Sequence, residues 1–183
     1  MRYLTLAPVS VGRRRHKVGL GRAPFRDKIG ATEERCSVHH GREIKTTGDG
    51  FLALFDSPTR AALCAAEMLR SATAIGLAIR VGIHTGEVEV TEDDVRGIAV
   101  HTAARILALA GPGTALFSTS AAELVDGPGL GFEDAGSHEL KGLAGVRRVS
   151  RLVVAGGRDR GPDPERPGSA GRPPAVDPTP AGA

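Results

Sequence analysis

The 183-residue sequence is poor in aromatic residues, which make up 3% of the chain and include no tryptophan. Hydrophobic residues still reach 40%, so we expect a core built from Ala, Val, Leu and Ile. The sequence also lacks an apolar run of membrane-spanning length. In residues 1–17 the charges follow the apolar stretch, the reverse of a secretory signal. We therefore expect a cytoplasmic protein with no membrane partner.

Cysteine is also scarce, and the two cysteines, Cys36 and Cys64, do not have the spacing of a metal site. We expect a reduced compartment, with Cys64 as a small core residue.

Charge is spread unevenly along the chain. Residues 1–42 contain ten basic and three acidic side chains. A basic arm can contact nucleic acid or anionic lipid, but such segments are more often solvated, so we do not expect nucleic acid as a partner. The last 28 residues, 156–183, are rich in Pro and Gly and predict a disordered tail. We therefore predict a poorly ordered arm at residues 1–40, one domain at residues 41–155 and the tail.

The stretch Gly41–Phe55 predicts a β-hairpin, because Asp49-Gly50 is a strong turn signal between two strand-like runs. The second run, residues 51–55, is apolar throughout, and Lys45 and Asp49 are the candidate functional residues beside it. In one interpretation Asp49 only shapes the turn and Lys45 extends to solvent. In the other, Asp49 presents a carboxylate to a metal and Lys45 presents an ammonium to a ligand.

The remaining pattern predicts an α+β fold in which helices pack on a largely antiparallel sheet. Tyr3 to Val11 is at most a short strand, because Pro8 interrupts it. The predicted helices cover residues 58–74, 97–110 and a short segment from Ser118 or Ser120 to Val125. The further strands are predicted at 79–84, 86–90, 114–118, 132–136, 137–140 and 146–154.

Four more residues are candidates for a binding site. Asp94 precedes the helix at 97–110, and His101 and Arg105 lie one turn apart on it. Lys141 lies in a glycine-punctuated loop. Each has an ordinary alternative: a helix-end charge for Asp94, a satisfied histidine for His101 and a surface ion pair for Arg105. Together they suggest a site for an anion such as phosphate.

Four motifs occur in family order and spacing, and with them residues 41–154 resemble the catalytic domain of class III adenylate and guanylate cyclases of the compact bacterial type. The motifs are GREIKTTGDGFLALFDSP, IRVGIHTGEVE, DVRGIAVHTAARI and FEDAGSHELKGL. The resemblance implies the ferredoxin-like cyclase fold and adenylate cyclase activity in intracellular signal transduction. In that reaction the ribose 3′-hydroxyl of ATP attacks the α-phosphate and releases pyrophosphate.

The resemblance also assigns roles to the nucleotide-binding residues. Lys45 and Asp94 are similar to the pair that reads adenine. Arg105 is similar to the arginine that stabilises the transition state, and His101 stands where many relatives have Asn. Lys141 is similar to the lysine that holds the terminal phosphates. Family sites form between two chains, so a homodimer or a heterodimer with another cyclase domain is implied.

For the metal ions, Mg²⁺ or Mn²⁺, the resemblance implies two aspartates. Asp49 is similar to the second. The nearest match to the first is Asp27, in the stretch 25–32, but Arg26 and Lys28 do not suit a buried strand. The short separation between Asp27 and Asp49 also leaves no room for the usual first helix. The alternative is therefore a weak or inactive cyclase-homology module that acts in dimerisation or regulation.

Overall fold

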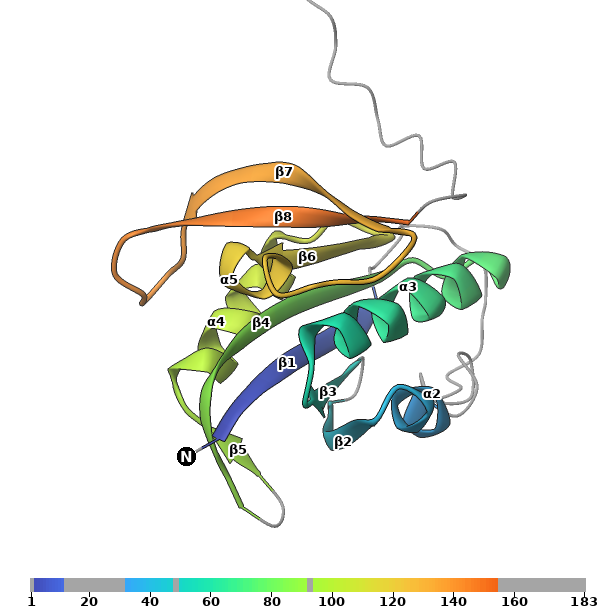
Figure 1. Cartoon of the computed structure of the whole chain (residues 1–183), viewed down its shortest axis with the longest axis horizontal. Coiled ribbons are helices and arrows are strands. Elements are labelled where there is room, and N and C mark those ends of the chain that lie inside the picture. The colour runs from blue at the N-terminus through green and yellow to red at the C-terminus, as the bar shows by residue number, and fades with distance from the viewer. Residues whose placement is uncertain (1, 12–31, 48–49, 92–93, 155–183) are drawn as a thin grey trace, which may run out of the picture.

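The computed structural model describes residues 2–11, 32–47, 50–91 and 94–154 (Figure 1). They form one largely antiparallel sheet with helices on both faces. The strands are β1 (Arg2–Val11), β2 (Gly41–Thr47), β3 (Gly50–Phe55), β4 (Ile79–Val90), β5 (Val95–Arg96), β6 (Thr114–Ser118), β7 (Leu130–Glu139) and β8 (Val146–Val154). The helices are α2 (Thr32–Val38), α3 (Pro58–Ala74), α4 (Ile98–Leu109) and α5 (Thr119–Ala122). The predicted α+β class is confirmed.

The strand order is β2-β3-β1-β4-β6-β8-β7, and β5 pairs with β4 beside this path. The β4–β6 pair is parallel, and the other pairs are antiparallel. The predicted lack of a first helix concerns residues 12–31, which lie outside the described residues, as does the predicted tail at 156–183. Both stay predictions.

The arm predicted at residues 1–40 needs correction, because β1 lies near the centre of the sheet between β3 and β4. Pro8 does not end this strand. Its position is paired with Leu52 of β3, while the ladder to β4 has no pair at Ala7 and Pro8. A proline lacks the N–H that a ladder needs, so the interruption on one side accommodates it. The short helix α2 was also missed by the sequence pattern.

Strand β4 is a second correction, because it is one continuous strand where two were predicted. Gly86 does not mark a turn. A Cβ at this position would lie 2.9 Å from the Cβ of Ala99, so the glycine allows α4 to approach the strand closely. Gly82 does the same nearer the C-terminal end of α4, where a Cβ would lie 2.3 Å from the Leu107 nitrogen.

Helix α3 covers one face of the sheet, and α4 covers part of the other (Figure 1). Ser57 and Pro58 begin α3, and Gly76, with φ +72°, follows its end. The main core lies beneath α3. It includes Phe55, Met68, Ile83 and Phe117 among its larger side chains. Leu63 of the same helix is exposed.

Two smaller clusters hold α4 on the opposite face. The first joins Ala99 and Ala103 to β3, β4 and β5 through Leu54, Val88 and Val95. The second joins the C-terminal half of α4 to β6 and β8, and contains Ile106, Ala110, Leu116, Leu140 and Val149. The sheet and these clusters fix the position of α4, which carries two of the candidate site residues.

The closing strands form one hairpin, β7–β8. The two strands predicted at 132–136 and 137–140 are one strand with an irregularity between Asp134 and Ser137. The predicted short helix is α5, where the Ser118 side chain accepts a hydrogen bond from the Ala121 nitrogen (3.3 Å). Among the residues that the structure describes, no helix combines the length and the apolar character needed to cross a membrane.

Candidate functional site

Lys45 lies on the face of the sheet that α4 covers in part. The β2–β3 ladder shifts between Glu43 and Lys45, so that Lys45 stands opposite Leu52. Residues opposite one another across an antiparallel pair share a face, and Leu52 packs against the cluster beneath α4. The shift therefore places an exposed ammonium beside that cluster, which the sequence pattern did not predict.

Asp94 lies close enough to Lys45 for the two charges to interact. The Asp94 carboxylate accepts the Val95 backbone N–H (2.9 Å) and lies 3.7 Å from the Arg96 guanidinium. The Val95 hydrogen bond, followed by the charges of Lys45 and Arg96, lowers the pKa of Asp94. The connection is structural as well, because Val95 is buried in the same cluster that Ile44 packs against. Two residues far apart in sequence thus come within electrostatic reach of each other, while the ion pair of Asp94 is with Arg96.

His101 and Arg105 lie on the solvent side of α4. Thr102, Ala103 and Ile106 are buried against the sheet, while His101 and Arg105 are exposed. Arg105 therefore leaves the core and is accessible to an anion or to another chain. Within the described residues, no hydrogen bond or ion pair of either side chain is seen.

Lys141 follows a residue that is anchored beside α4. Leu140 is buried in the cluster that contains Ile106 and Ala110, and the Leu143 nitrogen donates to the Leu140 carbonyl (2.9 Å). Lys141 itself is exposed. The loop thus begins against the C-terminal half of α4 and presents a cation there.

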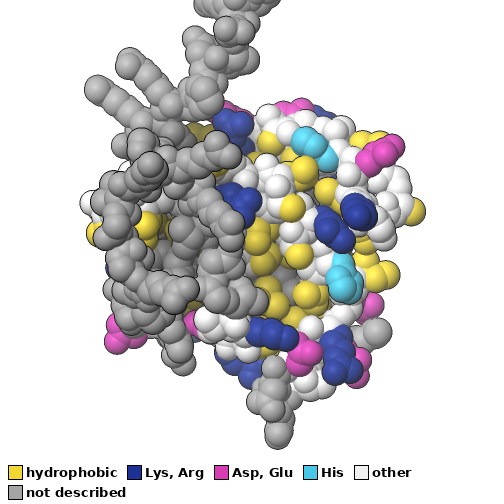
Figure 2. All heavy atoms as spheres, turned by 180° about the vertical axis from the view of Figure 1, so that it is seen from behind, with side chains coloured by type: hydrophobic (Ala, Val, Ile, Leu, Met, Phe, Trp, Pro, Cys, Tyr) yellow, Lys and Arg dark blue, Asp and Glu magenta, His cyan; other side chains and the backbone are white. Residues whose placement is uncertain are grey.

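Lys45 and Lys141 lie beside the two clusters that hold α4 on its face of the sheet. Figure 2 shows the side of the chain opposite to the view of Figure 1, where Lys, Arg and His side chains surround a hydrophobic area. A face with exposed cations around apolar surface suits a ligand that has both a planar base and phosphates.

The predicted metal ligands cannot be placed, because Asp27 and Asp49 lie outside the described residues. Strand β1 occupies the position beside the hairpin, with Ser10 opposite Gly50. Ser10 accepts a hydrogen bond from the Arg80 guanidinium (3.0 Å), and β1 contains no acidic residue. The described part of the chain also has no group of three or more His, Cys, Asp or Glu side chains arranged for a metal. The metal roles of Asp49 and Asp27 therefore stay predictions.

Sequence reasoning missed a polar link on the α4 face. The His84 Nδ1 lies 2.8 Å from the Ser118 Oγ, which also lies 3.1 Å from the Ser120 Oγ. Burial, and then the charge of Arg147, lowers the pKa of His84 to about 4. The imidazole is thus neutral at pH 7 and links β4 to the start of α5. The sequence signal was weak, since a lone histidine within a strand has many possible roles.

Comparison with known proteins finds sequence similarity over most of the described domain. Residues 25–153 match the family model of the adenylate and guanylate cyclase catalytic domain. A Rhizobium meliloti (strain 1021) protein named "Putative adenylate cyclase 3" is 34% identical over 151 residues, which are 78% of this chain and 25% of that protein. An uncharacterized Mycobacterium bovis protein is 32% identical over 118 residues, 63% of this chain and 41% of its own length. The chain thus spans less than half of either relative.

Solved structures show the same fold. The adenylate/guanylate cyclase/hydrolase from Silicibacter pomeroyi has a TM-score of 0.68 at 24% identity, covering 84% of this chain and 98% of its own. The adenylyl cyclase CyaB from P. aeruginosa has a TM-score of 0.70 at 18% identity, covering 87% and 97%. The guanylate cyclase domain from Catenaria anguillulae, solved in complex with GTP, has a TM-score of 0.69 at 16% identity, covering 83% and 96%.

Proposed function

Because the chain belongs to the family of adenylate and guanylate cyclase catalytic domains, we propose that it takes part in converting ATP to 3′,5′-cyclic AMP and pyrophosphate. The observation that carries this proposal is the placement of Lys45 and Asp94 within electrostatic reach on the face beside α4. Both groups come from the described part of the chain.

The pair accounts for a choice of base. Adenine presents a ring-nitrogen acceptor next to an exocyclic amine, which is a donor. The Lys45 ammonium donates and the Asp94 carboxylate accepts, so the two match this pattern. Guanine presents the opposite pattern on the corresponding edge, with a ring N–H donor and a carbonyl acceptor. Against guanine, Lys45 and Asp94 would each meet a group of their own kind, and ATP is therefore the proposed substrate.

The exposed cations of the same face would act on the phosphates. Arg105 presents a planar guanidinium that stabilises negative charge on the α-phosphate as the ribose 3′-hydroxyl attacks and pyrophosphate leaves. Lys141 would hold the terminal phosphates. His101, one turn before Arg105, would position the ribose or the phosphate by hydrogen bonding. All three are exposed in the single chain, so a second chain is needed to enclose the nucleotide.

The chain would supply the nucleotide-reading half of a site shared between two cyclase domains. Mg²⁺ or Mn²⁺ would require carboxylates that the described residues do not provide. The second domain, in a dimer with this chain, is proposed to bring the metal aspartates. A homodimer with Asp49 and Asp27 as ligands is the other arrangement of the same reaction.

A second candidate function is a cyclase-homology module that pairs with a cyclase and regulates it without turnover. The observation favouring it is β1, the strand paired with the hairpin, which contains no acidic residue and whose Ser10 accepts a hydrogen bond from the Arg80 guanidinium. The two functions differ in whether cyclic AMP is formed.

The experiment that separates them incubates the purified chain with Mn²⁺-ATP or Mn²⁺-GTP, alone and with an intact cyclase domain. The nucleotides are then separated by chromatography. Cyclic AMP formation that depends on this chain supports the first function. A dimer with the cyclase domain that forms no additional cyclic AMP supports the second.

A further inference from the structure

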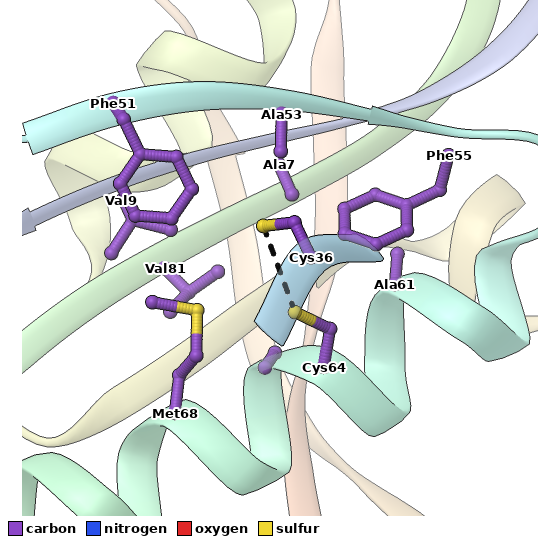
Figure 3. Close-up of a pocket in the computed structure, with 11 residues that line it drawn as sticks. Ala7, Val9, Cys36, Phe51, Ala53, Phe55, Ala61, Cys64, Met68 and Val81 are labelled. Atoms are coloured by element: carbon purple, nitrogen blue, oxygen red, sulfur yellow. Dashed lines mark hydrogen bonds between the residues drawn. The ribbon is translucent and has the colours of Figure 1, made fainter. Parts of the chain in front are cut away.

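Two buried thiols face each other between α2 and α3, on the side of the sheet away from Lys45 and Asp94. The Cys36 and Cys64 sulfur atoms lie 4.0 Å apart, and the residues are 1% and 2% exposed. They are the two cysteines of the whole chain. Figure 3 shows their side chains pointing toward one another from the two helices.

The thiols border a small, mostly apolar pocket. Its wall includes Cys36, Cys64, Phe55 and Met68 (Figure 3). Such a pocket excludes a bulky thiol reagent more readily than a molecule the size of water. The small uncharged oxidant hydrogen peroxide is therefore the best match.

Polar contacts outside the pocket hold α2 in position over α3. Arg35 donates to Glu67 (2.7 Å) and to Ser71 (2.9 Å), and His39 lies 2.9 Å from the second Glu67 oxygen. These contacts flank the thiol pair and hold the two cysteine-bearing segments beside each other.

The two thiols differ in their hydrogen bonds. Cys64 S–H donates toward the Cys36 sulfur and also lies near the Arg35 carbonyl oxygen (3.9 Å). The hydrogen bond from Cys64 lowers the pKa of Cys36, against the effect of burial. The same hydrogen bond, together with burial, raises the pKa of Cys64. Cys36 is thus the better nucleophile of the two.

We propose that Cys36 and Cys64 are a modification site at which hydrogen peroxide forms a reversible disulfide joining α2 to α3. The Cys36 thiolate attacks one peroxide oxygen, the O–O bond breaks, and hydroxide leaves to take up the proton released from Cys36. The Cys64 sulfur then displaces the hydroxyl of the Cys36 sulfenic acid, and its own proton leaves with that hydroxyl as water. Two thiols are oxidised, and one peroxide is reduced to two waters.

The bond requires a modest movement. The sulfurs of a disulfide are about 2 Å apart, so they must approach by about 2 Å from the observed separation. The shift falls on α2, a seven-residue helix tied to α3 through Arg35 and, just after its end, through His39. The bond would close a loop that contains β2 and β3, and it would thereby constrain the unfolded chain. This inference does not rest on the proposed cyclase reaction.

The test treats the reduced full-length chain with hydrogen peroxide and then alkylates free thiols under denaturing conditions. Intact mass is expected to show monomeric chain that has lost two hydrogens and carries no alkyl group. Melting temperature should rise by about 5 °C or more, and dithiothreitol should reverse both changes. Cys36→Ser and Cys64→Ala should each retain one alkylatable thiol and show no rise.

Two controls keep the result interpretable. Met68→Leu removes the oxidisable thioether of the same pocket and should still form the disulfide. The folding of each cysteine variant is checked by its own melting curve before oxidation. The proposal is overturned if peroxide leaves both thiols of the folded wild-type chain alkylatable, or produces only higher cysteine acids, Met68 sulfoxide or disulfide-linked dimers.

Discussion

Lys45 stands opposite Leu52 in the β2–β3 ladder, and this pairing turns its ammonium to the face of the sheet beneath α4. Without the shift after Glu43, Ile44 would occupy that position. This irregularity therefore decides which face of the sheet carries the Lys45 ammonium. Only on the α4 face is it within electrostatic reach of Asp94. The base preference proposed above depends on this one feature of β2.

Replacing Lys45 by Met should weaken ATP binding about 10- to 100-fold, because one charge-assisted hydrogen bond of about 1.5–3 kcal/mol is lost. GTP binding should change less, so the preference for ATP should shrink. Titration with a fluorescent nucleotide and unlabelled competitors measures both. The matched control is Arg70→Met, which removes an exposed cation from α3. Helix α3 covers the face of the sheet opposite to Lys45. Equal weakening by the two variants would contradict a specific role.

Replacing Asp94 by Asn should shift the base preference from ATP toward GTP. The amide oxygen can still accept the Val95 N–H, so the local turn is retained, while the new NH₂ can donate to the guanine carbonyl. We expect the ratio of ATP to GTP affinity to fall about tenfold, measured by competition. Asp134→Asn, at an exposed carboxylate of β7, changes the charge equally and should leave the ratio as it is. An unchanged ratio in Asp94→Asn would show that the carboxylate does not read the base.

Replacing Arg105 by Ala should lower the rate of cyclic AMP formation about 10²–10³-fold while the chain stays folded. The side chain is exposed, so the free energy of unfolding should change by no more than about 0.5 kcal/mol. Urea unfolding and cyclic AMP assay of the same preparation, mixed with an intact cyclase domain, measure the two effects. Arg70→Ala serves as the control for loss of an exposed arginine. A large loss of stability in Arg105→Ala would place this side chain in the fold rather than in the site.

Acid should destabilise the chain through His84. Its folded-state pKa, about 4, lies below the usual value of 6.5 because burial opposes the charged form. The unfolded state therefore binds more protons between these values, and stability falls as pH decreases from about 6.5 to 4, by at most about 3 kcal/mol. Urea unfolding across this range in wild type and His84→Gln measures the effect.

The variant should have a flatter profile. Ser118→Ala removes the partner hydroxyl but leaves the imidazole buried, so it should be less stable at every pH and still show the fall. The pKa of Glu67 is also lowered, mainly by its hydrogen bond with His39. Its protonation reduces the free energy of unfolding only below the usual glutamate pKa of 4.5. An identical slope in His84→Gln and wild type above pH 4.5 would contradict the assignment.

Much of the fold follows from short-range signals in the sequence. Asp49-Gly50 predicted the β2–β3 hairpin, and the helix predicted at 58–74 has the bounds of α3. The spacing of Ala99, Ala103 and Ile106 predicted the buried side of α4, which the structure has. These signals are local, so they do not depend on distant parts of the chain.

The failures concern features that distant contacts decide. Pro8 argued against a central strand, but the pairing with β3 continues through it while the ladder to β4 is interrupted. The break predicted between residues 84 and 86 does not occur, because β4 is continuous and Gly86 accommodates the close approach of Ala99. The Cys36–Cys64 pair depends on how α2 packs on α3, which no spacing rule reveals.

The candidate site was predicted in part. Lys45, Asp94, His101, Arg105 and Lys141 were all chosen from the sequence, and the structure places the first two near each other and the next two on the solvent side of α4. The shift in β2 that orients Lys45 could not be read from the sequence, because β2 is mostly polar and has no apolar alternation that fixes its register. The metal roles of Asp49 and Asp27 stay predictions.

Complementation measures the central claim most directly. The chain is mixed with an intact cyclase domain in which the residues corresponding to Lys45 and Arg105 are replaced, so that this partner retains its metal aspartates but cannot read or stabilise ATP. We predict no cyclic AMP from either protein alone with Mn²⁺-ATP, formation by the mixture, and loss when Arg105→Ala replaces the wild-type chain. A stable mixed dimer that makes no cyclic AMP would contradict the account and favour a regulatory module. Robust cyclic AMP formation by the chain alone that survives Asp27→Ala would contradict it in the other way, by showing that the chain completes its own metal site elsewhere.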